Sequence, residues 1–187
     1  MLNKEYLIGS LNKPIGLKVL NNLIKEIENE SDIELIYSLS KSENKKIEFH
    51  SAWLLEKLCT KDLEFSVHFL MDLLNNFDKI NNQSALRSFS KIIAMILNNK
   101  AKLSGKISKI IDSCNKEKII ETCFSYIINK TTPISLNQWL VDILLYYSQE
   151  QDWIKEELNL FAQSLQIQST PAKLQCAKRI KKILSLC

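Results

Sequence analysis

Glycine and proline are scarce in this sequence, with three of each among 187 residues. Turns with positive φ, β-hairpins and phosphate-binding loops all use glycine, so this composition disfavours β-rich folds and nucleotide-binding α/β folds. No apolar run approaches the roughly 20 residues that span a bilayer, and the first residues lack the apolar core of a signal peptide. We therefore expect helices joined by short polar turns, in a cytoplasmic protein without a membrane segment.

Metal-binding patterns are also missing. The only histidines are His50 and His68, and neither has another His or a Cys three or four residues away, the spacing of helical metal motifs. The cysteines are odd in number and form no CxxC pair, which indicates reduced, structural thiols. They are Cys59, Cys114, Cys123, Cys176 and Cys187. The sequence predicts neither a metal nor a cofactor.

A catalytic site is not apparent either. His50 could act as a base oriented by Glu56, but six residues separate them, more than one and a half helical turns. This spacing favours a structural role for His50. Because no nucleophile, base and orienting group can be named together, an enzyme is the least favoured class of function.

Helical periodicity is what the sequence does contain. Between Lys46 and Leu58, apolar or small residues recur at i, i+4, i+7, i+8 and i+11, which is one face of a helix. The same pattern along the chain predicts an all-α fold without β-sheet. The expected helices are approximately 16–29, 32–41, 45–59, 62–78, 82–98, 116–129, 133–148, 152–167 and 171–185.

Four of these helices share one register, which indicates an internal repeat. Their equivalent anchor residues are Ser51, Phe89, Leu140 and Ala177. The anchors are spaced 38, 51 and 37 residues apart. Three residues beyond each anchor stand Leu54, Ile92, Ile143 and Ile180, which we expect to be buried. A period near 38 with two helices per unit is typical of an α-solenoid.

The long middle interval and the helix starts refine this expectation. The Lys-rich stretch at about 99–114 accounts for the extra length, so we interpret it as an irregular insertion. Thr132-Pro133 and Thr170-Pro171 each place a capping hydroxyl before a proline, the arrangement of a helix start. We predict a single domain over 1–187, an α-α superhelix of HEAT-like helix pairs.

Several separated segments resemble one family. They are His50-Ser51-Ala52-Trp53-Leu54-Leu55-Glu56, Ser84-Ala85-Leu86-Arg87, Glu121-Thr122-Cys123-Phe124 and Asp152-Trp153-Ile154. In this order, over about residues 15–185, they are similar to a small bacterial family of HEAT or armadillo-type helical repeats. The family has no stated function, although some members are labelled adenylosuccinate lyase. The resemblance implies the fold only, because the Ser-Ser-x-Met-Pro loop of such lyases does not occur here.

One column of the repeat is the candidate binding strip. Two residues beyond the anchors stand Trp53, Lys91, Asp142 and Arg179. Three of the four are charged, so the column is expected to face solvent and Trp53 to anchor a partner, although an inter-repeat seam would bury that tryptophan. The leading hypothesis, by analogy of fold, is a module that binds or scaffolds a protein partner.

The alternative partner is a nucleic-acid backbone. The last helix carries a candidate basic patch composed of Lys173, Lys178, Lys181 and Lys182, with Arg179 among them. A cluster of cations can neutralise phosphates, and helical-repeat proteins use such surfaces on DNA. The structural interpretation is that cations near a helix C-terminus complement its dipole.

Overall fold

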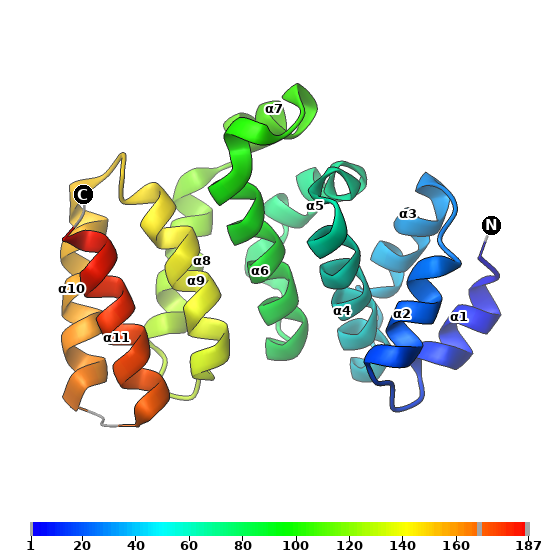
Figure 1. Ribbon diagram of the computed structural model, residues 1–187, viewed down its shortest axis with the longest axis horizontal. Helices are drawn as coiled ribbons and strands as arrows, with labels where there is room; N and C mark the ends of the chain where they lie inside the picture. The colour runs from blue at the N-terminus through cyan, green and yellow to red at the C-terminus, as the bar shows by residue number, and fades with distance from the viewer. Residues whose placement is uncertain (1, 168–169, 186–187) are drawn as a thin grey trace. The chain divides into compact units, whose positions relative to one another are not determined.

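A computed structural model of the chain describes residues 2–167 and 170–185, and within them every regular element is helical (Figure 1). The all-α prediction is confirmed for these residues. Contacts between Cα atoms divide the chain into two compact units, which we call unit 1 (Met1–Cys114) and unit 2 (Asn115–Cys187).

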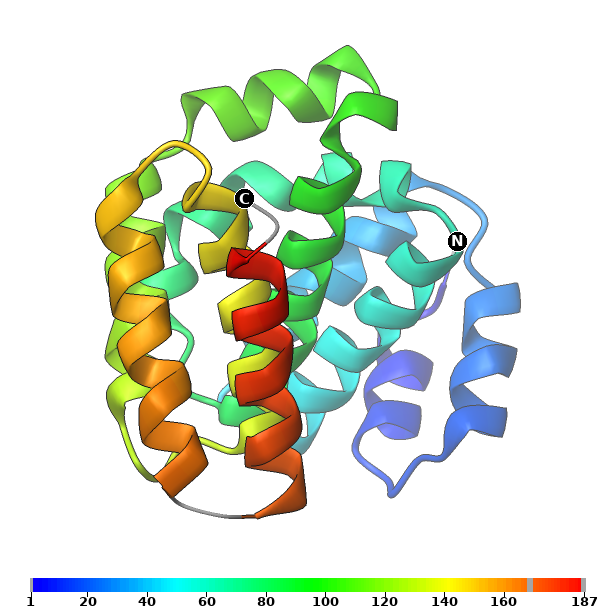
Figure 2. The same ribbon diagram turned by 60° about the vertical axis from the view of Figure 1, so that its left-hand side comes forward.

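Unit 1 is built around one long helix, α4. Its elements are α1 (Lys4–Leu11), α2 (Leu17–Lys25), α3 (Glu30–Leu39), α4 (Lys45–Lys61), the 3₁₀ turn η1 (Leu63–His68), α5 (Leu70–Asn75), η2 (Phe77–Lys79), α6 (Gln83–Asn99), η3 (Lys100–Lys102) and α7 (Gly105–Ser113). Helix α4 contacts α1, α2 and α3, and it packs along α6, which lies beside it (Figures 1 and 2). The α4–α6 pair therefore forms the centre of unit 1.

Unit 2 consists of two helical hairpins. The first joins α8 (Lys116–Ile128) to α9 (Ile134–Tyr147), and the second joins α10 (Asp152–Ile167) to α11 (Pro171–Leu184). Helix α9 contacts both α10 and α11, so the hairpins pack against each other (Figure 2). The predicted helices at 133–148, 152–167 and 171–185 are confirmed within one residue at each end.

Asparagine side chains start many of the helices. At each of these positions the side-chain oxygen accepts from a backbone N–H of the first turn, which would otherwise have no partner. These caps are Asn3, Asn29, Asn44, Asn82 and Asn115. Five of the 16 asparagines in the sequence therefore specify where helices begin.

The predicted buried register is confirmed. Leu54, Ile92, Ile143 and Ile180 are all 0% exposed. The anchors Ser51, Phe89, Leu140 and Ala177 are buried as well. These positions lie on α4, α6, α9 and α11, so each of these helices directs the same register into a core.

The helix predicted at 62–78 is wrong, because the structure breaks it into η1, α5 and η2. Phe69 has φ −139° and ψ −8°, which lies outside the α region. In a 3₁₀ turn residues i and i+3 lie on one side, and accordingly Ser66 and Phe69 are buried while Val67 is only half-buried. An α-helix over 62–78 would have a period of 3.6 residues instead and would not follow this three-residue spacing.

The expectation that the stretch at 99–114 is an irregular insertion is also wrong. It forms η3 and the nine-residue helix α7, which lies across one end of unit 1 (Figure 1). Ile107 and Ile111, four residues apart, are buried, and α7 contacts α5 and η1. These two isoleucines give α7 an apolar face, so it packs as part of the core of unit 1.

Two predicted helix starts also differ. Helix α3 begins at Glu30, two residues before the predicted range 32–41, and Asn29 is its cap. Helix α9 begins after Pro133, which occupies the cap position itself, so the Thr132 hydroxyl does not cap it. The Thr170-Pro171 start is confirmed, because the Thr170 side chain accepts from the Lys173 N–H.

Candidate functional site

Two stacked aromatic rings lie on the surface of α4. Phe49 and Trp53 are four residues apart, so they occupy the same face of the helix, and their ring centroids are 5.8 Å apart with an interplanar angle of 4°. Both side chains are half-buried. Trp53 is therefore neither fully buried nor fully exposed, and it lies between the two predicted states with Phe49 stacked on it.

A buried carboxylate lies one helical turn beyond this stack. The side chain of Glu56 is 3% exposed and accepts a hydrogen bond from Ser88 Oγ at 2.7 Å and another from Lys91 Nζ at 2.9 Å. Both donors come from α6, so Glu56 ties α4 to its neighbour. A buried carboxylate is tolerated only with such partners, because removing its charge from water is costly.

Three cations surround that one carboxylate. In addition to Lys91, Arg87 lies 3.9 Å and Lys57 lies 4.0 Å from the Glu56 oxygens. All three cations remain partly exposed, so the surface has an excess of positive charge beside the aromatic stack. We call the surface formed by Phe49, Trp53, Glu56, Lys57, Arg87 and Lys91 the aromatic–basic face.

In unit 2, the two remaining residues of the predicted column bond to each other. Arg179 Nη2 on α11 donates to Asp142 Oδ1 on α9. Asp142 is buried, contrary to the expected solvent-facing position, whereas Arg179 is exposed. Burial raises the pKa of Asp142, and the bond from Arg179 acts in the opposite direction. This pair joins two helices of unit 2 and leaves one face of the guanidinium accessible.

The predicted basic patch is only partly gathered. Lys178, Lys181 and Lys182 are exposed and share one face of α11, since they are three and four residues apart. Lys181 Nζ donates to Gln166 Oε1 of α10 at 2.8 Å. Lys173, five residues before Lys178, is half-buried near the start of the helix. The exposed patch therefore consists of three lysines on α11.

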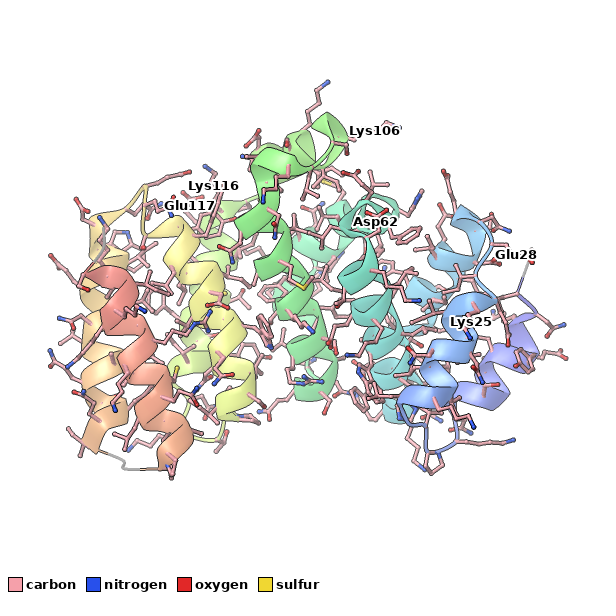
Figure 3. All side chains as sticks on the ribbon, viewed as in Figure 1. Lys25, Glu28, Asp62, Lys106, Lys116 and Glu117 are labelled. Atoms are coloured by element: carbon pink, nitrogen blue, oxygen red, sulfur yellow. The ribbon has the colours of Figure 1, made fainter. Side chains whose placement is uncertain are left out.

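A polar hollow at the other end of α4 is a further candidate. It lies between η1 and α7, and its lining includes Asp62, Glu64, His68 and Lys106. Asp62 and Lys106 both lie at this end of unit 1 (Figure 3). Glu64 Oε1 accepts from the Ser104 N–H at 2.7 Å, so one acid here joins η1 to the start of α7. Within the described ranges, no three His, Cys, Asp or Glu side chains come together as a metal site requires.

His50 and the cysteines have structural positions. His50 is buried and its Nδ1 lies 2.6 Å from the carbonyl oxygen of Leu11, so it joins α4 to the end of α1. Cys59, Cys114, Cys123 and Cys176 are buried, and Cys187 lies outside the described residues. Burial raises the pKa of Cys59 to about 12 and that of Cys176 to about 11. These values disfavour the thiolate, which is the nucleophilic form of cysteine.

Sequence reasoning identified Trp53 and Lys91 but missed the other four members of the aromatic–basic face, which are Phe49, Glu56, Lys57 and Arg87. Glu56 was considered only as a partner for His50, and Arg87 only as part of a family resemblance. Glu56 lies four residues after Ala52 and three before Cys59, the spacing of a buried face. A charge in that register requires a partner on the adjacent helix, and this signal could have directed attention to Arg87 and Lys91.

Comparison with known proteins gives no relative: no family model, curated protein or solved structure matches this chain. Across residues 2–167 and 170–185, none of the helices combines the length and apolar character that a membrane span requires.

Proposed function

We propose that the chain is a protein-interaction module built from HEAT-like helix pairs, and that the aromatic–basic face is its binding surface. The observation that supports this proposal is the half-buried Phe49–Trp53 stack beside three cations that share one buried carboxylate. Aromatic and arginine side chains dominate the binding energy of many interfaces, and here both stand on two packed helices.

The helix pairing supports the repeat assignment within each unit. In unit 1, α4 packs directly against α6, and in unit 2, α9 packs directly against α11. All four carry the anchor register described above. The resemblance of several segments to a bacterial helical-repeat family points in the same direction. A superhelix that leaves one row of second helices open to a partner is the arrangement we propose.

The chemistry of the face favours an acidic peptide with an apolar side chain. The aromatic stack provides a flat apolar surface, and the three cations exceed the charge of Glu56 by two. A partner carboxylate can share Arg87 or Lys57 with Glu56, since both lie at the outer limit of ion-pair distance from it. Charge complementarity of this kind mainly increases the association rate and fixes the register.

Peptide display on the full chain tests this proposal. We expect peptides enriched in acidic residues next to a large apolar residue, and we expect Trp53→Ala and Arg87→Glu each to abolish the enrichment. Lys18→Ala, which changes an exposed lysine of α2, is the control and should retain it. Enrichment that survives both changes on the face, or no enrichment at all, would contradict the proposed surface.

A nucleic-acid backbone is the second candidate, because Lys178 and Lys182 are exposed and have no ion-pair partner among the described residues. A gel-shift series from low to physiological salt separates the two functions. If α11 binds phosphates, affinity should fall steeply with salt, and changing both lysines to Ala should reduce the slope by about two. Trp53→Ala should leave this binding unchanged.

A further inference from the structure

Unit 2 contains a cavity of about 330 Å³, distant in sequence from the aromatic–basic face. Helices α8 and α10 provide its apolar lining, and the start of α9 provides polar groups. The main apolar residues are Phe124, Ile127, Ile128, Leu160, Phe161 and Leu165. The volume falls at the lower end of the range for small-molecule sites, roughly 300–1,000 Å³.

Two buried polar atoms in the cavity lining have no hydrogen-bond partner among the described residues. They are Thr132 Oγ1 and Asn137 Oδ1, on side chains of residues only 7% and 5% exposed. Buried polar atoms in folded proteins are nearly always paired, because an unpaired one loses its bonds to water without replacement. The position of Pro133 explains the first, since it takes the cap position of α9 and leaves the neighbouring hydroxyl unused.

The edge of the same cavity is apolar and exposed. Ile128 is 70% and Leu160 is 57% exposed, and both line the cavity from facing helices. Large exposed apolar side chains next to a concave site mark a place where an apolar group is covered on binding. The cavity thus combines an apolar wall with two polar atoms that have unmet hydrogen-bonding capacity.

The polar atoms define the chemistry of a matching group. Asn137 Oδ1 accepts, so the ligand must donate an N–H or O–H, and the Thr132 hydroxyl can donate to a carbonyl. Lys130, Lys173 and Glu157 stand in the lining with charges of both signs, which does not favour a charged head. We propose that this cavity binds a small neutral ligand with an aromatic or branched aliphatic body and a carboxamide head.

Titration of the ¹⁵N-labelled full chain with simple probes tests this proposal. Phenylacetamide and isovaleramide should shift backbone resonances of Ile128 and Leu160 together with the side-chain amide of Asn137. Ethylbenzene, which has the apolar body without the amide, should bind at least about tenfold more weakly, because it leaves both polar atoms unpaired.

Asn137→Leu is the decisive variant. It removes the buried acceptor, so we expect the preference for phenylacetamide over ethylbenzene to disappear, with no decrease in thermal stability. Asn159→Leu is the matched control: it changes an exposed asparagine of α10 that does not line the cavity, and it should keep the preference. If Asn137→Leu does not fold, Thr132→Val provides the same comparison by removing only the hydroxyl.

Three results would overturn the proposal. Equal affinity for phenylacetamide and ethylbenzene would show an apolar slot without polar recognition. The absence of shifts with both amides at millimolar concentration would show that water alone satisfies the two atoms. Retention of the preference in both Asn137→Leu and Thr132→Val would show that these atoms do not contact the ligand. None of these results bears on the aromatic–basic face, so the two proposals can fail separately.

Discussion

Trp53 contributes less to folding than a fully buried aromatic, because its ring packs on Phe49 and stays partly accessible. We predict that Trp53→Ala lowers the free energy of unfolding by about 1–2 kcal/mol, near the range measured for one aromatic pair and below that for a core aromatic. Leu54→Ala, which truncates its fully buried neighbour, should cost about 2–5 kcal/mol. Urea unfolding of both variants measures these two changes in the free energy of unfolding. Equal losses of stability would show that Trp53 belongs to the core.

Glu56 holds α4 and α6 together through charge-assisted bonds to Ser88 and Lys91. Glu56→Gln keeps the shape but removes the charge that balances three cations, so we predict a loss of about 1–3 kcal/mol of stability. Glu34→Gln, an exposed change on α3, is the control. Chemical denaturation of both variants in low and high salt measures this difference. If the loss of stability in Glu56→Gln disappears at high salt, the pairing of Glu56 is a surface effect.

Asp142 predicts a pH dependence with a definite sign. Its pKa is raised in the folded state, chiefly by burial, so the folded protein holds this proton more tightly than the unfolded chain. The protonated carboxyl therefore stabilises the fold below about pH 4, which is the ordinary pKa of an aspartate. This stabilisation is lost as the pH rises through the pKa of Asp142 in the folded state. Each unit of pKa difference corresponds to about 1.4 kcal/mol.

The corresponding test is Asp142→Asn measured by urea unfolding between pH 4 and pH 7. Wild type should lose stability relative to the variant as the pH rises, while Asp152→Asn, an exposed change at the start of α10, should follow wild type. If wild type instead gained stability with pH relative to Asp142→Asn, attraction to Arg179 would outweigh burial.

At the scale of elements, α7 changes the expected role of the stretch at 99–114. Ile107 and Ile111 are buried against the rest of unit 1, so we predict that Ile107→Ala and Ile111→Ala each cost about 2–5 kcal/mol. Lys109→Ala, an exposed change in the same helix, should be close to neutral. Differential scanning calorimetry measures all three, and neutral isoleucine variants would show that α7 is dispensable.

The sequence predicts some elements better than others for physical reasons. The helices with the anchor register were predictable because they bury one face at the regular period of 3.6 residues. The segment after Asp62 was not, because η1 follows a period of three and buries Ser66 and Phe69. The Asn caps give a local signal at the start of several helices, and they would have located α3 correctly.

The candidate site was less predictable than the fold. The repeat register identified Trp53 and Lys91, but the column also implied an exposed Asp142, which the structure buries. Whether a charged residue faces solvent or pairs across two helices depends on what the adjacent helix presents. That information lies about 35 residues away for Glu56 and Lys91, and no local pattern contains it.

For the whole molecule, the distribution of cysteines has a practical consequence. Cys59 lies in unit 1, and Cys123 and Cys176 lie in unit 2, all of them buried thiols. Each thiol reacts with an alkylating reagent only when its surroundings open. Burial also raises the pKa of Cys59 and Cys123, which slows their reaction further. With Cys187 replaced by Ser, each half of the chain therefore carries at least one buried thiol whose alkylation reports local opening. Timed alkylation read by mass spectrometry would show, without any added label, which half opens first.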